Sequence, residues 1–423
     1  MDSHIATLSN GLRIATTEMP GAQSVSVNIF VGAGSRYEEK RINGISHFLE
    51  HMLFKGTHKR PQAIIISEAI EGAGGRSNAF TAHEETCYLA KVPFDQFALA
   101  LDIISDMVND PLLATEEVER ERQVVIEEIR RTWDHPAAWA GELLSQAIFG
   151  DQPLGWDVAG TEETVRGISR QDMADYVDTW YVPNNIVVSV AGNVAHDQVL
   201  ELAGSYFENR RPTELAKFKP AGPRVDSKPI VVETRAITQA NLLMAVRGLS
   251  RTDPERYVLR IFSNLLGAGM SSRLFKEVRE RRGLAYSVGC GTTLYQDIGV
   301  LTASAGVSPE KVVETTEVIL GEFHKLVDEP VGEEELTKAR DYSVGTFRLG
   351  LEDTMSVARW VGDSLITTGQ VQDVEEVVSK LRAVTVSDLQ RMARRLFVDN
   401  ELSVALTGPN DETDRLAAVI GRA

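Results

Sequence analysis

The sequence has only two cysteines among 423 residues, Cys87 and Cys290, and their spacing fits neither a disulfide framework nor a thiolate metal site. A reducing, cytoplasmic setting is therefore expected, with both cysteines as small buried apolar residues. No apolar run approaches the roughly 20 residues that a membrane-spanning helix needs. The N-terminus has neither the basic nor the apolar region of a signal peptide. These absences argue against a disulfide-stapled secreted domain and predict no membrane segment.

Positive charge is also scarce. Lysine and arginine number 44 against 61 aspartates and glutamates, which gives a formal net charge of −17 at pH 7. Nucleic acid binding requires a basic footprint, so this balance argues against DNA or RNA as a partner. The acidic excess would suit a basic peptide if the acids lined one cavity, or it could serve only to keep the protein in solution.

The two halves of the sequence share an order of motifs. At a constant offset of 216 residues, Asp172 corresponds to Asp388 and Gly192 to Gly408. Earlier in each half, VNIFVGAGSRYEE resembles LLMAVRGLSRTDP. The sequence therefore predicts a duplicated fold.

The length is too great for one ordinary hydrophobic core and predicts at least two domains. Residues 209–228 are rich in proline, charge and small side chains, as is typical of a linker. The linker would separate an N-terminal lobe over 1–208 from a C-terminal lobe over 229–423. Strand-like and helical segments mix in each lobe without strict alternation, which predicts an α+β fold with a sheet covered by helices.

Local patterns place several elements. Asn10-Gly11 between apolar segments predicts a hairpin turn. The alternating segment SVSVNIFV predicts a strand over 24–31. Amphipathic periodicity predicts helices, including those over 94–108, 115–133 and 137–148.

The segment GISHFLEHMLFKGT, residues 44–57, raises the question of function. Residues four apart share one face of an α-helix, so His47 and His51 would point the same way, with Glu50 beside them. Two imidazoles at this spacing can bind one Zn²⁺, and the carboxylate is then free to take a proton from water that the metal activates. The alternative is a pair of core histidines satisfied by hydrogen bonds. With only 8 histidines in the chain, the combination favours a metal site.

The second half of the sequence lacks this polar set. In the corresponding helix of the second half, Ile261, Asn264 and Leu265 stand at the positions of His47, Glu50 and His51, respectively. If those polar residues were needed for folding, the second copy should have kept them. They are therefore predicted to be functional.

The third ligand is expected to be an acid on a buried helical face, because a catalytic zinc usually has three protein ligands and an open fourth position. In ATEEVERERQVVIEEIRRTW, Glu121, Val125 and Glu128 lie on one stripe at spacings of three and four. Glu127 lies about 100° away and is expected to be solvated. We predict Glu128 as the ligand. Glu121 would orient a histidine or support the site, or alternatively is a plain surface acid.

H-x-x-E-H is the inverted order of the zincin motif and marks the inverzincins. HFLEHMLFKGT, with ERERQVVIEEI downstream, resembles the M16 family of zinc peptidases, which includes pitrilysin, insulin-degrading enzyme and the mitochondrial processing peptidase. The resemblance covers nearly the whole chain. The length and GMSSRLFKEVRERRGLAYSV are similar to the short, processing-peptidase-type branch. The resemblance implies that His47, His51 and Glu128 hold zinc. It also implies that Glu50 is the general base and that Glu121 is an acid near the site.

Two further sets of residues follow from the resemblance. GRSNAFTAHEETCYLAKV is similar to the family's substrate-binding edge strand, with Asn78, Ala79 and Phe80 beside the zinc. An exposed edge can pair with the backbone of an extended peptide, although an ordinary strand of the sheet is the alternative. Arg279 and Tyr286 in RERRGLAY match a pair that binds substrate and stabilises the transition state, and both side chains are suitable donors to an oxyanion. From the residues alone, Arg279 would be a surface helix residue and Tyr286 a half-buried strand residue.

Short members of this branch pair two subunits into a closed chamber. The resemblance therefore implies a homodimer in which Arg279 and Tyr286 serve the zinc of the other subunit. The expected function is zinc-dependent hydrolysis of extended, unfolded peptides or presequence-like segments.

Two alternatives remain open. The first is a catalytic subunit that requires an unlike, zinc-less partner chain, as in the processing peptidase. The second is a non-catalytic scaffold similar to the core subunits of respiratory complexes. The loop LLGAGMSS is shorter and less glycine-rich than that of the inactive processing-peptidase subunit, and the chain carries both the zinc set and the Arg/Tyr pair. A self-sufficient enzyme is therefore favoured.

Overall fold

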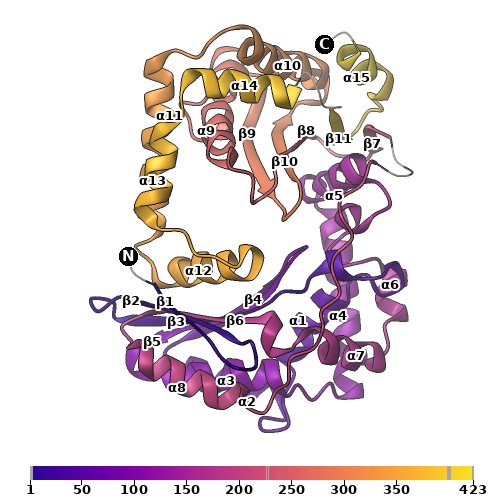
Figure 1. Cartoon of the computed structure of the whole chain (residues 1–423). Coiled ribbons are helices and arrows are strands. Elements are labelled where there is room, and N and C mark those ends of the chain that lie inside the picture. Colours follow the sequence, from indigo (N-terminus) through magenta and orange to yellow (C-terminus); the bar gives the residue numbers. More distant parts are fainter. Residues whose placement is uncertain (1–2, 225, 227, 398–401, 422–423) are drawn as a thin grey trace. The chain divides into compact units, whose positions relative to one another are not determined.

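The computed structural model describes residues 3–224, 226, 228–397 and 402–421 (Figure 1). Positions 225 and 227 of the predicted linker lie outside these residues, and the rest of the linker contains no helix or strand. The chain forms two compact units, and each combines segments from both halves of the sequence. The first unit comprises the residues up to Ile129, Asp157–Lys219 and Arg348–Val374. The second comprises Arg130–Trp156, Pro220–Phe347 and the residues from Glu375 onward.

The first unit is built on a six-stranded sheet in the order β1-β2-β6-β3-β5-β4. The strands are β1 (Ser3–Thr7), β2 (Arg13–Glu18), β3 (Ser24–Val31), β4 (Arg76–Thr81), β5 (Thr86–Pro93) and β6 (Ile186–Gly192). β3 matches the predicted strand. β1 and β2 form the hairpin predicted at Asn10-Gly11, and Gly11 has a φ of +87°, in the region that favours glycine. β4 lies at the outer edge of the sheet, so one side of its backbone has no strand partner among the described residues.

Helices cover both faces of this sheet. The helices of this unit are α1 (Ile45–Leu53), α2 (Ala63–Gly72), α3 (Phe97–Asn109), α4 (Thr115–Asp134), α6 (Glu162–Gly167), α7 (Arg170–Trp180), α8 (His196–Phe207) and α12 (Thr354–Thr368). Alternate side chains of β3 point to opposite faces. Val25, Val27 and Ile29 join the core with α1, α3 and α8, whereas Phe30 packs with Val361 of α12.

The second unit repeats the strand topology. Its sheet has the order β7-β11-β8-β10-β9, with one parallel pair followed by three antiparallel pairs, as in β2-β6-β3-β5-β4. The strands are β7 (Ile230–Thr234), β8 (Ala240–Gly248), β9 (Ala285–Leu294), β10 (Gly299–Val307) and β11 (Ser403–Gly408). The helices are α5 (Pro136–Phe149), α9 (Arg256–Gly267), α10 (Val312–Asp328), α11 (Glu333–Gly350), α13 (Val374–Ala383), α14 (Val386–Phe397) and α15 (Thr413–Ile420). This shared topology agrees with the predicted duplication.

One helix of each sheet comes from a distant part of the chain. α12 packs on β3 and β6 of the first unit (Figure 1). There, Ser189 Oγ donates to the carbonyl of Ala358 at 2.8 Å. α5 packs on β8 and β11 of the second unit. α12 therefore lies in the unit that holds most of residues 1–208, and α5 in the unit that holds most of residues 229–423. Among the described residues, no helix is long and apolar enough to cross a membrane.

The two cysteines differ in burial. Cys87, in β5, is fully buried as predicted. For Cys290 the prediction was wrong, because this residue lies in the edge strand β9 and is only partly buried. Neither forms a disulfide.

Candidate active site

A buried acid holds the N-terminus of α1. The Glu38 carboxylate accepts hydrogen bonds from the backbone N–H groups of Gly44 at 2.7 Å and Ser46 at 2.9 Å, which have no partner within the helix. Burial raises the pKa of Glu38, and these hydrogen bonds oppose that shift. Gly44 has a φ of +96°, and a Cβ there would lie 2.5 Å from the carbonyl oxygen of Ala159. Glycine is therefore required where α1 begins, one turn before His47.

His47, His51 and Glu128 come together between α1 and α4. Nε2 of His51 lies 3.2 Å, and Nε2 of His47 3.6 Å, from Oε2 of Glu128. One ligand atom from each residue lies within 4.8 Å of the other two, and all three side chains are partly exposed. Two imidazole nitrogens and one carboxylate oxygen are a donor set that suits Zn²⁺ in a catalytic site, where a fourth position stays open. The arrangement fits a zinc ion.

The two nitrogens of His47 have different surroundings. Nδ1 is buried and has no hydrogen-bond partner in the part of the chain that the structure describes, whereas Nε2 faces Glu128. Burial, and then the charge of His51, lower the pKa of His47 to about 4. The imidazole is therefore neutral at pH 7, as metal binding requires.

Glu121 orients the second histidine. Its Oε1 lies 3.0 Å from Nδ1 of His51, and its Oε2 lies 2.7 Å from Nζ of Lys55. Burial lowers the pKa of His51, but the hydrogen bond with Glu121 and the nearby carboxylates outweigh it and raise the pKa. For Glu121, burial alone would raise the pKa. The hydrogen bonds to His51 and Lys55 outweigh burial, so the pKa of Glu121 is lowered. Glu121 is therefore a carboxylate that turns Nε2 of His51 toward Glu128. By contrast, Glu127 is exposed.

Glu50 lies beside this cluster on α1 and is tied to β4. Thr81 Oγ1 donates a hydrogen bond of 2.7 Å to Oε2 of Glu50. Burial raises the pKa of Glu50, which brings it toward the range in which a carboxylate works as a general base, although the Thr81 bond opposes the shift. Thr81 could not be predicted from the sequence, because nothing in the pattern links it to Glu50, 31 positions away.

Thr81→Val is expected to lower kcat without releasing metal, because it removes the donor that orients Glu50 and leaves the ligands in place. A hydrogen bond to a charged group contributes about 1.5–3 kcal/mol, so the expected loss is about tenfold or more. Thr81→Ser keeps the hydroxyl and should retain most of the activity. Steady-state kinetics beside zinc analysis of each variant checks this. Equal activity of the valine variant and the wild type would show that Thr81 has no such role.

The three predicted substrate-binding residues lie in β4. Ala79 packs with the α1 side of the sheet, as Thr81 does, whereas Phe80 packs with the cluster that includes α12. Asn78 precedes them and is exposed. β4 thus has a free backbone edge and also contacts Glu50 through Thr81.

The structure brings Arg279 and Tyr286 together in the second unit. Arg279 belongs to a π-helix over Phe275–Arg281, and its guanidinium lies 5.2 Å from the centroid of the Tyr286 ring. Tyr286 is in β9 and is 78% exposed, whereas half-burial was expected from the pattern alone. Short π-helical segments are frequent at functional sites. Both side chains are available to a ligand.

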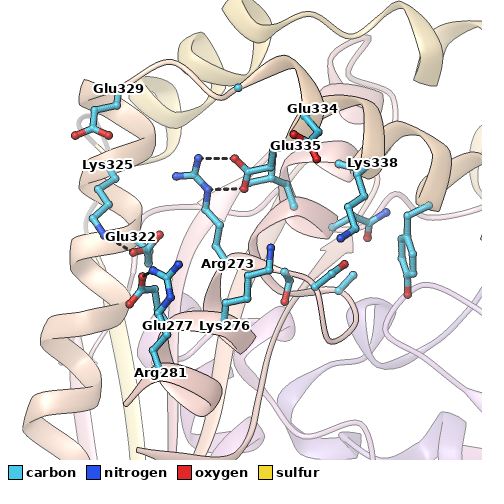
Figure 2. Close-up of a pocket in the computed structure, with 18 residues that line it drawn as sticks. Arg273, Lys276, Glu277, Arg281, Glu322, Lys325, Glu329, Glu334, Glu335 and Lys338 are labelled. Carbon is cyan, nitrogen blue, oxygen red and sulfur yellow. Dashed lines mark hydrogen bonds and ion pairs between the residues drawn. The ribbon is translucent and has the colours of Figure 1, made fainter. Parts of the chain in front are cut away.

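The second unit also has a cavity of about 630 Å³ that contains none of the predicted site residues. Figure 2 shows Arg273 pointing at Glu335, with which it forms two hydrogen bonds of 2.8 Å. Lys325 pairs with Glu322 at 2.6 Å in the same wall. Acids and bases alternate around the cavity, so neither sign of charge dominates it.

Comparison with known proteins identifies the family. A family model described as Insulinase (Peptidase family M16) matches residues 13–162, and one described as Peptidase M16 inactive domain matches residues 167–342. An uncharacterized zinc protease of Streptomyces coelicolor is 36% identical over 409 residues, which cover 95% of this chain and 89% of that protein. An uncharacterized zinc protease of Bacillus subtilis is 35% identical over 407 residues, which cover 96% and 98%.

The fold agrees with this result. The crystal structure of a protease from Helicobacter pylori matches with a TM-score of 0.89 and 24% identity, covering 96% of this chain and 99% of that one. The protein is therefore a metallopeptidase. It belongs to peptidase family M16. The family, the enzyme class and the two-lobed α+β fold expected from the sequence are confirmed.

Proposed function

We propose that the protein is a zinc-dependent endopeptidase that hydrolyses extended, unfolded peptides or presequence-like segments inside a chamber enclosed by a homodimer. The observation that carries the proposal is the convergence of His47, His51 and Glu128 next to Glu50, with the free edge of β4 attached to Glu50 through Thr81. The names of the curated relatives, zinc proteases, support the choice of metal.

Each residue has a role in this proposal. Zinc held by His47, His51 and Glu128 would lower the pKa of a water molecule and polarise the scissile carbonyl. Glu50 takes a proton from the attacking water as the new C–O bond forms, and later gives it to the departing amine as the C–N bond breaks. β4 would bind the peptide backbone by strand addition, which gives affinity without strict sequence selection.

Arg279 and Tyr286 complete the proposed mechanism. Their guanidinium and phenol groups would donate hydrogen bonds to the oxyanion of the tetrahedral intermediate. The resemblance to short, paired members of the family supports a model in which Arg279 and Tyr286 act at the active site of the partner subunit. A homodimer would then contain two composite sites.

Co-expression of two defective variants tests this arrangement. Glu50→Gln lacks the base, and Arg279→Ala lacks the donor but should keep its zinc. In a C2 homodimer formed at random, half of the molecules are mixed and each has one intact site, so co-expression should restore about a quarter of wild-type activity. Each variant alone should be nearly inactive.

The same experiment separates the alternatives. Activity of the purified wild type alone argues against a required unlike partner and against a non-catalytic scaffold. An inactive, zinc-loaded wild type that gains activity only with a second, zinc-less chain would contradict the homodimer. An active wild type without recovery in the mixture would contradict the composite site and leave the zinc mechanism standing.

A further inference from the structure

The side chains on the two faces of β4 contact different residues. Thr81 and Ala79 point to the α1 side, where Thr81 contacts Glu50. Phe80, on the other side, belongs to a cluster with Val361 and Leu365 of α12. The same edge strand therefore borders the proposed catalytic residues on one face and α12 on the other.

An arginine of α12 lies over Phe80. The guanidinium carbon of Arg359 is 4.3 Å from the centroid of the Phe80 ring, within the range of a cation–π contact. The side chain of Arg359 is exposed, and no carboxylate of the described residues forms an ion pair with it. The other charged residue within α12 is Asp363, one helical turn further on, which takes part in interactions of its own. The cationic head of Arg359 thus stands at the edge strand and is available to a ligand.

A peptide that adds to β4 would present its side chains alternately to the two faces. One alternate set would face α1 and Glu50. The other set would face Phe80 and Arg359. Charge selection at the α12 face would therefore apply to every second residue of the peptide and not to its neighbours.

We infer that Arg359 selects for acidic side chains at peptide positions on the α12 face of β4. The inference rests on the proposed function, because it takes β4 as the strand that binds peptide. The net charge of −17 attracts positively charged molecules over long range. A direct contact at one position acts within a few ångströms, whereas charges further away than about 8 Å are largely screened at physiological salt. A local preference for acid at one peptide position can therefore coexist with the negative net charge of the protein.

The test uses quenched, unstructured peptides that differ only in placing Glu, Gln or Lys at each of six consecutive positions around the scissile bond. Wild type should prefer Glu to Lys in kcat/KM at alternate positions on one face, by about fivefold for a partly exposed charge pair. Arg359→Glu should invert the preference at those positions, and Arg359→Gln should flatten it. Zinc content should stay the same in both variants.

Arg166→Glu is the matched control. It makes the same charge change at an exposed arginine of α6 that pairs with Glu162, so it should leave the positional profile unaltered. An active wild type whose profile does not change in Arg359→Glu would overturn the role of Arg359 and leave the proposed peptidase intact. The same shift in the Arg166→Glu control would also overturn it, because the effect would then come from net charge. A wild type that cleaves no peptide would overturn both proposals.

Discussion

Glu50→Gln is expected to keep its zinc and to lose nearly all turnover. The amide has the same shape and can still accept a hydrogen bond from Thr81, but it cannot take a proton from water. General base catalysis contributes a factor of about 10²–10⁴, so kcat should fall by at least about 100-fold. Since the three ligands remain, zinc content measured by mass spectrometry should stay at the wild-type level.

Glu127→Gln provides the matched control for this experiment. Glu127 lies next to Glu128, the proposed ligand, on α4 but is exposed, so its conversion should leave kcat and zinc content nearly unchanged. A Glu50→Gln variant that retains a substantial fraction of kcat with its metal bound would show that another group removes the proton.

His51→Ala is expected to lose the metal itself. Nε2 of His51 is the closer of the two imidazole nitrogens to Glu128, and Nδ1 is already oriented by Glu121. Loss of a residue that only orients a ligand typically costs 10–100-fold in affinity, so removal of a direct ligand should cost more than about 100-fold. Competition with a chromophoric chelator measures the affinity, and activity should fall in step.

His58→Ala is the control for the loss of a histidine. This side chain is exposed and pairs with Asp110, outside the metal cluster, so zinc affinity should be preserved. Circular dichroism of each variant establishes that the fold is intact. A folded His51→Ala protein with wild-type zinc affinity would mean that His47, His51 and Glu128 are not the ligand set.

The part of the site that depends on helical periodicity could be predicted from the sequence. Two histidines four apart share a face wherever the helix forms, and the stripe of Glu121, Val125 and Glu128 separates the inward acids from Glu127. The structure places both of these acids beside His51. This placement could be predicted because it follows from local helix geometry.

The remainder depends on contacts between distant segments. Glu38 comes from the loop before α1, Thr81 comes from the edge strand, and Arg359 comes from a helix in the last quarter of the chain. None belongs to a periodic pattern shared with the zinc motif. The order of repeated motifs predicted two similar sheets, but it gave no sign that α12 packs on the first sheet.

In the proposed mechanism, one zinc ion bound by this chain drives peptide hydrolysis. The most direct test is to strip the purified wild type with a chelator and to measure hydrolysis of a quenched, unstructured peptide as zinc is returned. Activity should be absent at the start, rise linearly with added zinc and reach its plateau at about one ion per chain, as expected for a single three-ligand site. Hydrolysis that persists without metal, or that is absent with one zinc bound to each chain, would contradict the account.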